Sequence, residues 1–303
     1  MKELKHLKSY LKKMKKKVYR IPYLGFYTRA YVLGDLSKST PIIVLHGGPG
    51  GCVERYEPLE KLAEYGIPLI FYDQLGCGYS KIPKSAKISW NFGVFLDELK
   101  NLISYFKLKN YILLGHSWGG MLALEYVCNH SHEGLEKLIL FSTLPSTRIW
   151  NEEHVKMIAD FTPDEQEALF AERDGQPYDQ KVYKVAVRKF YKLHVGKRSK
   201  DIYPFKTKRF PKTNAKIYGE MWGKSELFGN GTLANWSVEN KLNSIRIPTL
   251  ILSGAMDESS PKMNKLMNSE IKNSKWILLE NSHHIGYVEE PELVIKIIKD
   301  FVC

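Results

Sequence analysis

The chain has 303 residues, of which 44% are hydrophobic and 12% aromatic, so it can bury one large core together with an inserted subdomain. No apolar run approaches the roughly 20 residues that span a bilayer, and the N-terminus lacks the apolar stretch of a secretory signal, so we expect a cytoplasmic protein. The cysteines show neither a CxxC nor a Cys/His spacing, which argues against a metal site and against a disulfide framework.

A lysine-rich arm opens the chain and carries much of its formal net charge of +12. Residues 1–17 combine these lysines with apolar residues at spacings of three and four, which predicts an amphipathic helix. We expect the arm to pack on the main domain or to trail from it. Docking on a membrane surface or on a partner is the alternative.

The chain then takes on the pattern of a sheet. Residues 18–21, 23–27 and 29–33 are predicted to be antiparallel strands, with breaks at Pro22 and Gly34. Short apolar runs, typical of strands buried on both faces, follow at 42–45, 69–72, 111–114, 138–141, 249–252 and 276–279. Helical patterns lie between most of them, notably at 92–106, 120–129 and 291–301. This alternation predicts an α/β fold with a mostly parallel sheet flanked by helices.

A glycine-rich motif, His46-Gly-Gly-Pro-Gly-Gly51, ends the first of these apolar runs. Such a turn can direct a backbone N–H group at the oxyanion that develops during acyl transfer. The motif lacks the Gly-Lys-Ser/Thr ending and the G-x-G-x-x-G spacing of nucleotide-binding loops. We therefore expect the Gly48 amide to belong to an oxyanion hole.

A G-x-S-x-G motif, Gly115-His-Ser-Trp-Gly119, stands between a predicted strand and a predicted helix. In this context the chain reverses so tightly that side chains have no room beside the serine, whose hydroxyl is pushed out over the sheet. The motif predicts Ser117 as a nucleophile and the amide of Trp118 as the second oxyanion donor.

The alternation of strands and helices stops between residues 145 and 236. Amphipathic segments at 151–160, 163–172 and 182–194 are followed there by an irregular region rich in lysine, glycine and aromatic residues. Because this stretch lies between two predicted sheet strands, we expect an inserted, mainly helical lid. The expected organisation is an arm (1–17), a first core part (18–144), the lid (145–236) and a second core part (237–303).

The acid and the base of such a site are expected after the serine, in the order Asp, His, on loops that follow late strands. Asp257 fits the acid, since it follows a predicted strand in the phrase SGAMDE. Two adjacent histidines compete for the base. We choose His284, because it stands five residues before Glu289 and seven before Pro291, and we expect a structural role for His283.

Together these motifs resemble the proline iminopeptidase (prolyl aminopeptidase) family of α/β-hydrolase serine peptidases, including its tricorn-interacting aminopeptidase branch. The shared phrases are HGGPGG, DQLGCGYS, GHSWGG, FYKLHV, SELFG, ANW and MDE, and the resemblance extends from about Gly25 to the C-terminus. It implies the α/β-hydrolase fold, a Ser-His-Asp triad with an acyl-enzyme, and no metal or organic cofactor. The arm and the divergent details of the lid depart from the family pattern, which leaves the side-chain preference open.

The resemblance also implies the activity, which is removal of an N-terminal residue, preferably proline, from small peptides with a free N-terminus. In that family acidic side chains hold the substrate's α-amino group, and these roles fall here on Glu226 and Glu258. An esterase, a lactonase or an amino-acid amidase would share the triad without needing these carboxylates. A binding protein that holds nucleic acid or membrane through its arm would need none of the catalytic motifs, so we expect no nucleic-acid partner. The oligomeric state stays open.

Overall fold

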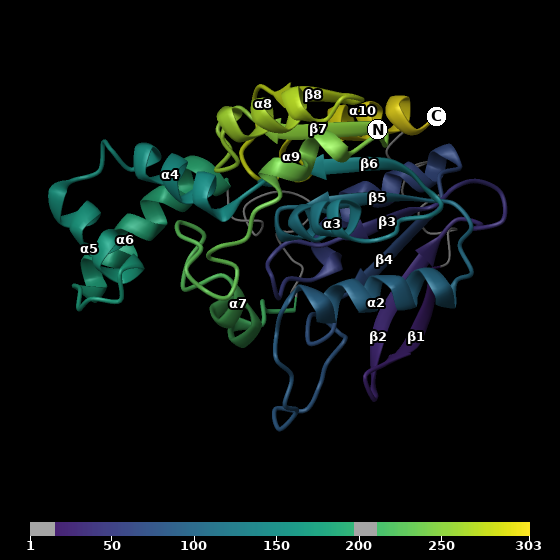
Figure 1. The fold of residues 1–303 in the computed structure, drawn as a ribbon, viewed down its shortest axis with the longest axis horizontal. Coiled ribbons are helices and arrows are strands. Elements are labelled where there is room, and N and C mark those ends of the chain that lie inside the picture. The colour runs from purple at the N-terminus through teal and green to yellow at the C-terminus, as the bar shows by residue number, and fades with distance from the viewer. Residues whose placement is uncertain (1–15, 197–210) are drawn as a thin grey trace, which may run out of the picture.

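A computed structural model of the chain describes residues 16–196 and 211–303. Within these ranges the strands form one 8-stranded sheet in the order β1-β2-β4-β3-β5-β6-β7-β8. The strands are β1 (Lys17–Tyr23), β2 (Phe26–Leu33), β3 (Ile42–Leu45), β4 (Leu69–Asp73), β5 (Tyr111–His116), β6 (Leu135–Phe141), β7 (Thr249–Gly254) and β8 (Ser274–Leu279). Strand β2 pairs antiparallel with β1 and β4, and the remaining neighbours pair parallel (Figure 1). The predicted fold class is confirmed.

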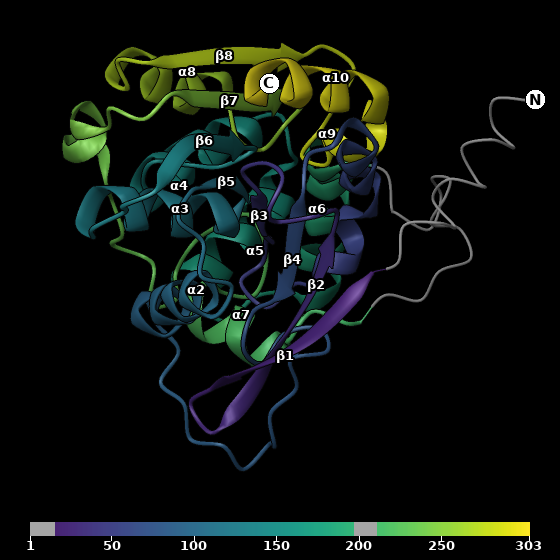
Figure 2. The same cartoon turned by 90° about the vertical axis from the view of Figure 1, so that its right-hand side faces the viewer.

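Helices cover both faces of the sheet because its strands alternate their side chains between two apolar layers. Ile43 and Leu45 of β3 belong to one buried cluster, whereas Ile42 and Val44 belong to the other. The first layer holds α2 (Phe92–Tyr105), α3 (Trp118–Asn129) and α8 (Pro261–Glu270), and the second holds the 3₁₀ helix η1 (Val53–Tyr65), α9 (Gly286–Glu289) and α10 (Pro291–Val302). Figure 2 shows the sheet between these two groups.

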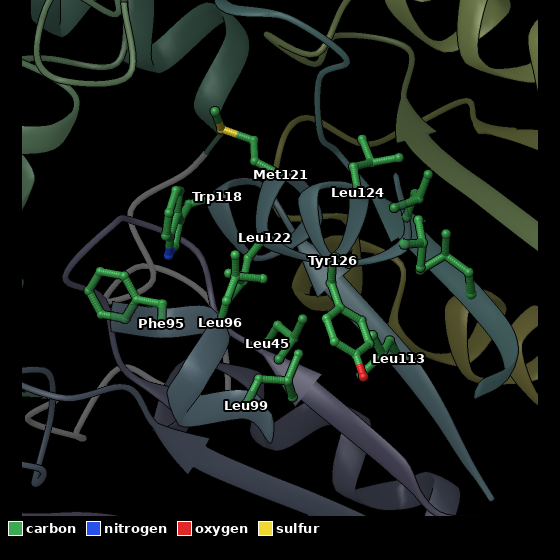
Figure 3. Close-up of a cluster of buried hydrophobic side chains, with 14 of the residues drawn as sticks. Leu45, Phe95, Leu96, Leu99, Leu113, Trp118, Met121, Leu122, Leu124 and Tyr126 are labelled. Atoms are coloured by element: carbon green, nitrogen blue, oxygen red, sulfur yellow. The ribbon is translucent and has the colours of Figure 1, made fainter. Parts of the chain in front are cut away.

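The layer around α3 fixes the start of that helix. Figure 3 shows side chains of α2 and α3 meeting side chains of β3 and β5, among them Leu45, Phe95, Leu99, Leu113, Trp118 and Leu122. Trp118, the first residue of α3, is almost fully buried in this cluster and lies edge-on to Phe95. The position of the turn between β5 and α3 is therefore set by the core.

Between β6 and β7 the chain leaves the sheet. It forms α4 (Thr147–Met157), α5 (Pro163–Arg173), α6 (Gln180–Phe190), the π-helical turn η2 (Tyr191–Val195) and α7 (Ala215–Met221), and it returns through the 3₁₀ helix η5 (Glu239–Ser244). In Figure 1, α4, α5 and α6 project to one side of the sheet. A separate apolar cluster, which includes Leu169, Tyr183, Phe190 and Phe228, holds this insertion together.

The start of the sheet differs from the prediction. Pro22 does not end a strand, and the three predicted stretches form two strands, since Pro22 lies within β1 opposite Tyr27. Proline is tolerated there because β1 is an edge strand, which does not need every N–H group. The reversal falls at Leu24 and Gly25, where φ is 49° and 76°. Most of the predicted arm, residues 1–15, lies outside the described residues, and none of the described helices is long and apolar enough to cross a membrane.

Candidate active site

Ser117 occupies the turn between β5 and α3, at φ 55° and ψ −123°. A non-glycine residue adopts such a conformation only where its surroundings enforce it. The flanking glycines permit the turn, because a Cβ at Gly115 would collide with the carbonyl of Gly119, and one at Gly119 with the carbonyl of Leu45. Ser117 lines a cavity of about 800 Å³ that lies between the sheet and the insertion.

His284 and Asp257, from the loops after β8 and β7, form a buried pair. His284 Nδ1 lies 2.8 Å from Asp257 Oδ1, which also accepts a hydrogen bond of 2.8 Å from the Ser259 amide. Burial acts to raise the pKa of Asp257, but His284 and the Ser259 amide hold it below its ordinary value. Asp257 is therefore ionised and fixes the imidazole, which leaves Nε2 of His284 for chemistry. His284 lines the same cavity as Ser117.

The neighbouring histidine has different partners. The backbone N–H of His283 donates to Glu289 Oε2 at 2.7 Å, and its Nδ1 lies 2.9 Å from Glu289 Oε1. The structure thus brings His284, and not His283, to Asp257.

The two candidate oxyanion donors flank Ser117. Gly48, at φ 133°, follows β3, and its amide has no hydrogen-bond acceptor within the described ranges. Trp118 is the first residue of α3, a position where the amide has no partner inside the helix. The Gln74 side chain braces both segments, because it accepts a hydrogen bond of 2.9 Å from Trp118 Nε1 and donates one of 3.2 Å to the His46 carbonyl.

A hydrogen-bond chain that no sequence motif predicted links the glycine-rich loop after β3 to the backbone of the candidate base. The Tyr56 hydroxyl accepts from the Gly47 amide at 2.7 Å and donates to His116 Nδ1 at 2.8 Å, and His116 Nε2 donates to the His284 carbonyl at 2.9 Å. Burial lowers the pKa of His116 to about 3, so the ring is neutral and these donor and acceptor roles are consistent. Tyr56 belongs to no motif, and His116 fills the variable position of G-x-S-x-G. The one feature of the sequence that could have indicated this hydrogen-bond chain is a histidine, His116, at the end of a strand predicted to be buried.

Glu258 is fully buried beside the candidate base. Its Oε1 lies 3.4 Å from His284 Nε2, and neither carboxylate oxygen accepts a hydrogen bond from any residue that the structure describes. Burial raises the pKa of Glu258 well above its ordinary value, despite the opposing charge of His284. A buried carboxylate without hydrogen bonds is costly and rare, which points to a ligand that supplies the missing donors.

Glu226 comes from the insertion, after α7, and also lines the cavity. Trp150 holds its backbone through a hydrogen bond of 2.9 Å from Nε1 to the Glu226 carbonyl. Burial raises the pKa of Glu226, and the charge of His284 opposes this effect. In turn, the charges of Glu258, Asp257 and Glu226 act to raise the pKa of His284.

Comparisons with known proteins place this geometry in a family. Residues 40–291 match a family model described as the alpha/beta hydrolase fold. A proline iminopeptidase from Clostridium botulinum is 35% identical over 283 residues, which cover 93% of this chain and 96% of the relative. The crystal structure of VinJ matches with a TM-score of 0.80 at 32% identity and covers 95% of this chain and 98% of the other. A proline iminopeptidase from Mycobacterium smegmatis matches with a TM-score of 0.78 at 26% identity, covering 94% of this chain and 97% of the other. With this likeness over nearly its whole length, the chain belongs to the proline iminopeptidase family of serine hydrolases with the α/β-hydrolase fold.

Proposed function

We propose that this protein is a serine aminopeptidase that releases an N-terminal residue, preferably proline, from short peptides. Relatives named proline iminopeptidase support the activity. The observation that carries the proposal is the pair of carboxylates, Glu226 and Glu258, next to the candidate base. A peptide's α-amino group is cationic near neutral pH, and such carboxylates would bind it through charge-assisted hydrogen bonds.

In the proposed reaction Ser117 Oγ attacks the carbonyl carbon of the first residue while His284 Nε2 takes the hydroxyl proton. The amides of Gly48 and Trp118 stabilise the tetrahedral oxyanion. The C–N bond then breaks, and His284 gives its proton to the departing amine, which leaves an acyl-enzyme. Water attacks the ester with His284 again as base, and collapse of the second intermediate returns the proton to Ser117 and releases the free amino acid. Asp257 keeps the imidazole oriented throughout.

The cavity suits a short peptide. Its volume of about 800 Å³ lies within the range of small-molecule sites. Its wall includes Glu226 and also three exposed cations, Arg55, Arg188 and Lys192. A short peptide carries an ammonium at one end and a carboxylate at the other, so it can match both kinds of charge.

We further propose that the enzyme works in the cytoplasm and that its arm takes no part in catalysis. All four cysteines are free thiols, the state that a reducing compartment maintains. Strand β1 starts at Lys17, and no candidate site residue precedes it. A protein that lacks residues 1–15 should therefore keep its kcat/KM on small substrates.

A panel of substrates tests the activity. Arylamides of proline, alanine and leucine, N-acetyl-Pro-arylamide and a simple aryl ester would be compared by kcat/KM. We expect Pro-arylamide to be the best amide and the acetylated compound to be poor, because it offers no ammonium. Equal cleavage of Pro-arylamide and its acetylated form would contradict the proposal and would favour a general esterase or amidase.

A further inference from the structure

The candidate base has a second anionic neighbour in addition to Asp257. His284 Nδ1 is committed to Asp257 at 2.8 Å, and Nε2 lies 3.4 Å from Glu258 Oε1. Nε2 is also the nitrogen that must take the proton of Ser117. Within the described ranges the Ser117 hydroxyl forms no hydrogen bond, so the charged partner of Nε2 in the free protein is Glu258.

The charges around His284 favour its protonated form. Burial alone would lower the pKa of His284, but Glu258, Asp257 and Glu226 together raise it to about 9, and the charge of His284 in turn opposes the rise that burial produces in the pKa of Glu258. The other histidines near this ring stay neutral, because burial lowers their pKa values. These are His116 of β5, His154 of α4 and His194 of η2. The carboxylates Glu226 and Glu258 have further titratable or charged neighbours, which are Tyr191 of η2, Tyr218 of α7 and Arg55 of η1.

A substrate ammonium would compete with this imidazolium. Glu258 has no hydrogen-bond donor in the described part of the chain, so its carboxylate is the natural partner for whichever cation lies beside it. Two adjacent cations in a buried site repel one another, and each makes the other harder to accommodate. Ammonium binding and protonation of His284 are therefore linked, and the linkage acts equally in both directions.

We propose that Glu258 holds His284 protonated in the resting enzyme, and that the substrate's ammonium, by pairing with Glu258, releases the imidazole to act as the base. This inference rests on the proposed function. Glu258 is then a positioning residue for His284 as well as a binding residue for the substrate. The class of substrate that switches the base on is the peptide with a free, cationic N-terminus.

The proton balance is simple. In the resting enzyme Nε2 carries a proton, and the imidazolium lies beside the Glu258 carboxylate. When a substrate ammonium binds, that proton leaves to solvent, and the number of cations beside Glu258 stays the same. Neutral Nε2 then accepts the proton of Ser117, and the imidazolium formed in the transition state is stabilised by Asp257, which remains in contact with Nδ1.

This linkage adds to specificity. An N-acylated peptide would lose the ion pair with Glu258, and it would also meet a base that is still protonated. The amino group therefore acts on the chemical step in addition to binding. A neutral ester that reaches Ser117 at neutral pH would also react slowly, because it brings no ammonium and His284 stays protonated.

The test uses a neutral fluorophosphonate, which labels Ser117 and carries no ammonium. Its labelling rate, followed against pH, should rise with an inflection near the resting pKa of His284, about 9. For Pro-arylamide, kcat reports the complex with substrate, and its inflection should lie at least one pH unit lower. Glu258→Gln should move the labelling inflection to lower pH. Labelling at pH 7 should then be faster by about tenfold for each pH unit that the inflection moves, while kcat/KM for Pro-arylamide falls.

Glu289→Gln is the matched control, because it removes a carboxylate that contacts His283 instead of His284. It should leave the labelling inflection in place. The inference is overturned if the labelling and kcat inflections coincide, if Glu258→Gln leaves the labelling inflection unchanged, or if Glu289→Gln shifts it equally. Each of these results could occur in an enzyme that still prefers free-amine substrates, so failure of the inference is distinct from failure of the proposed function.

Discussion

Replacing Tyr56 by phenylalanine would remove the hydroxyl that joins the glycine-rich loop after β3 to His116 and, through His116, to the candidate base. Tyr56 is 3% exposed, and its hydroxyl is bonded to the Gly47 amide at 2.7 Å and to His116 Nδ1 at 2.8 Å. The change leaves the buried Nδ1 of His116 without a partner, at a cost of about 1–3 kcal/mol, and it removes the partner of the part-buried Gly47 amide, which lines the cavity, at a cost near the lower end of that range. We therefore expect Tyr56→Phe to lower the free energy of unfolding by about 2–4 kcal/mol, measured by urea denaturation.

The same substitution should slow the reaction. His116 holds the carbonyl of His284, and a small displacement of a catalytic group costs about tenfold to a hundredfold in rate. We expect this loss in kcat for Pro-arylamide, with KM nearly unchanged, since Glu226 and Glu258 are untouched. Tyr72→Phe is the control, because the Tyr72 hydroxyl is buried without a partner in the described residues. If Tyr56→Phe changes stability and kcat no more than Tyr72→Phe does, the hydrogen-bond chain has no such role.

The triad and the buried histidines lead to three further predictions. Ser117→Ala should lower kcat for Pro-arylamide by about six orders of magnitude with the fold intact by circular dichroism, and substantial residual turnover in pure protein would refute the nucleophile. His284→Ala should be comparably damaging in the same assay and His283→Ala mild, and the reverse ranking would show that the base is His283. Burial lowers the pKa of His154 to about 3, so below about pH 6.5 the unfolded chain binds a proton there that the folded protein does not, and the unmodified protein should lose more stability between pH 6.5 and pH 4, by urea denaturation, than a His154→Gln variant; an equal pH dependence in both proteins would contradict a neutral buried ring.

The sequence predicted the parts of the fold that depend on local pattern. The apolar run at Ile42–Leu45 identified a strand buried on both faces, because that environment demands apolar side chains in every position. Pro22 was misinterpreted, since nothing local shows that β1 lies at a sheet edge where a missing N–H group is tolerated. Position in the sheet is a property of the whole chain.

In the site, too, local sequence pattern predicted some features, and others depend on how distant parts of the chain pack together. The position of Ser117 in the turn between β5 and α3 was predictable, because the turn requires glycines at fixed spacing around the serine. Tyr56 was not, since its role arises only when η1 packs against the end of β5. Glu226 and Glu258 were identified through the resemblance alone. The contact between Glu258 and His284 depends on two loops that are separate in the sequence and meet beyond the strand ends.

Recognition of a free amino terminus is the central claim, and the ratio of kcat/KM for Pro-arylamide to that for N-acetyl-Pro-arylamide tests it most directly. An acetylated N-terminus forms no ion pair with these carboxylates, and the loss of such a charged pair in a desolvated site costs on the order of 3 kcal/mol, which corresponds to about a hundredfold. We therefore predict a ratio of about 100 or more for the unmodified enzyme at neutral pH. We also predict that Glu226→Gln and Glu258→Gln each reduce this ratio. A ratio near one, unchanged in both variants, would contradict the assignment of Glu226 and Glu258 to the substrate's amino group.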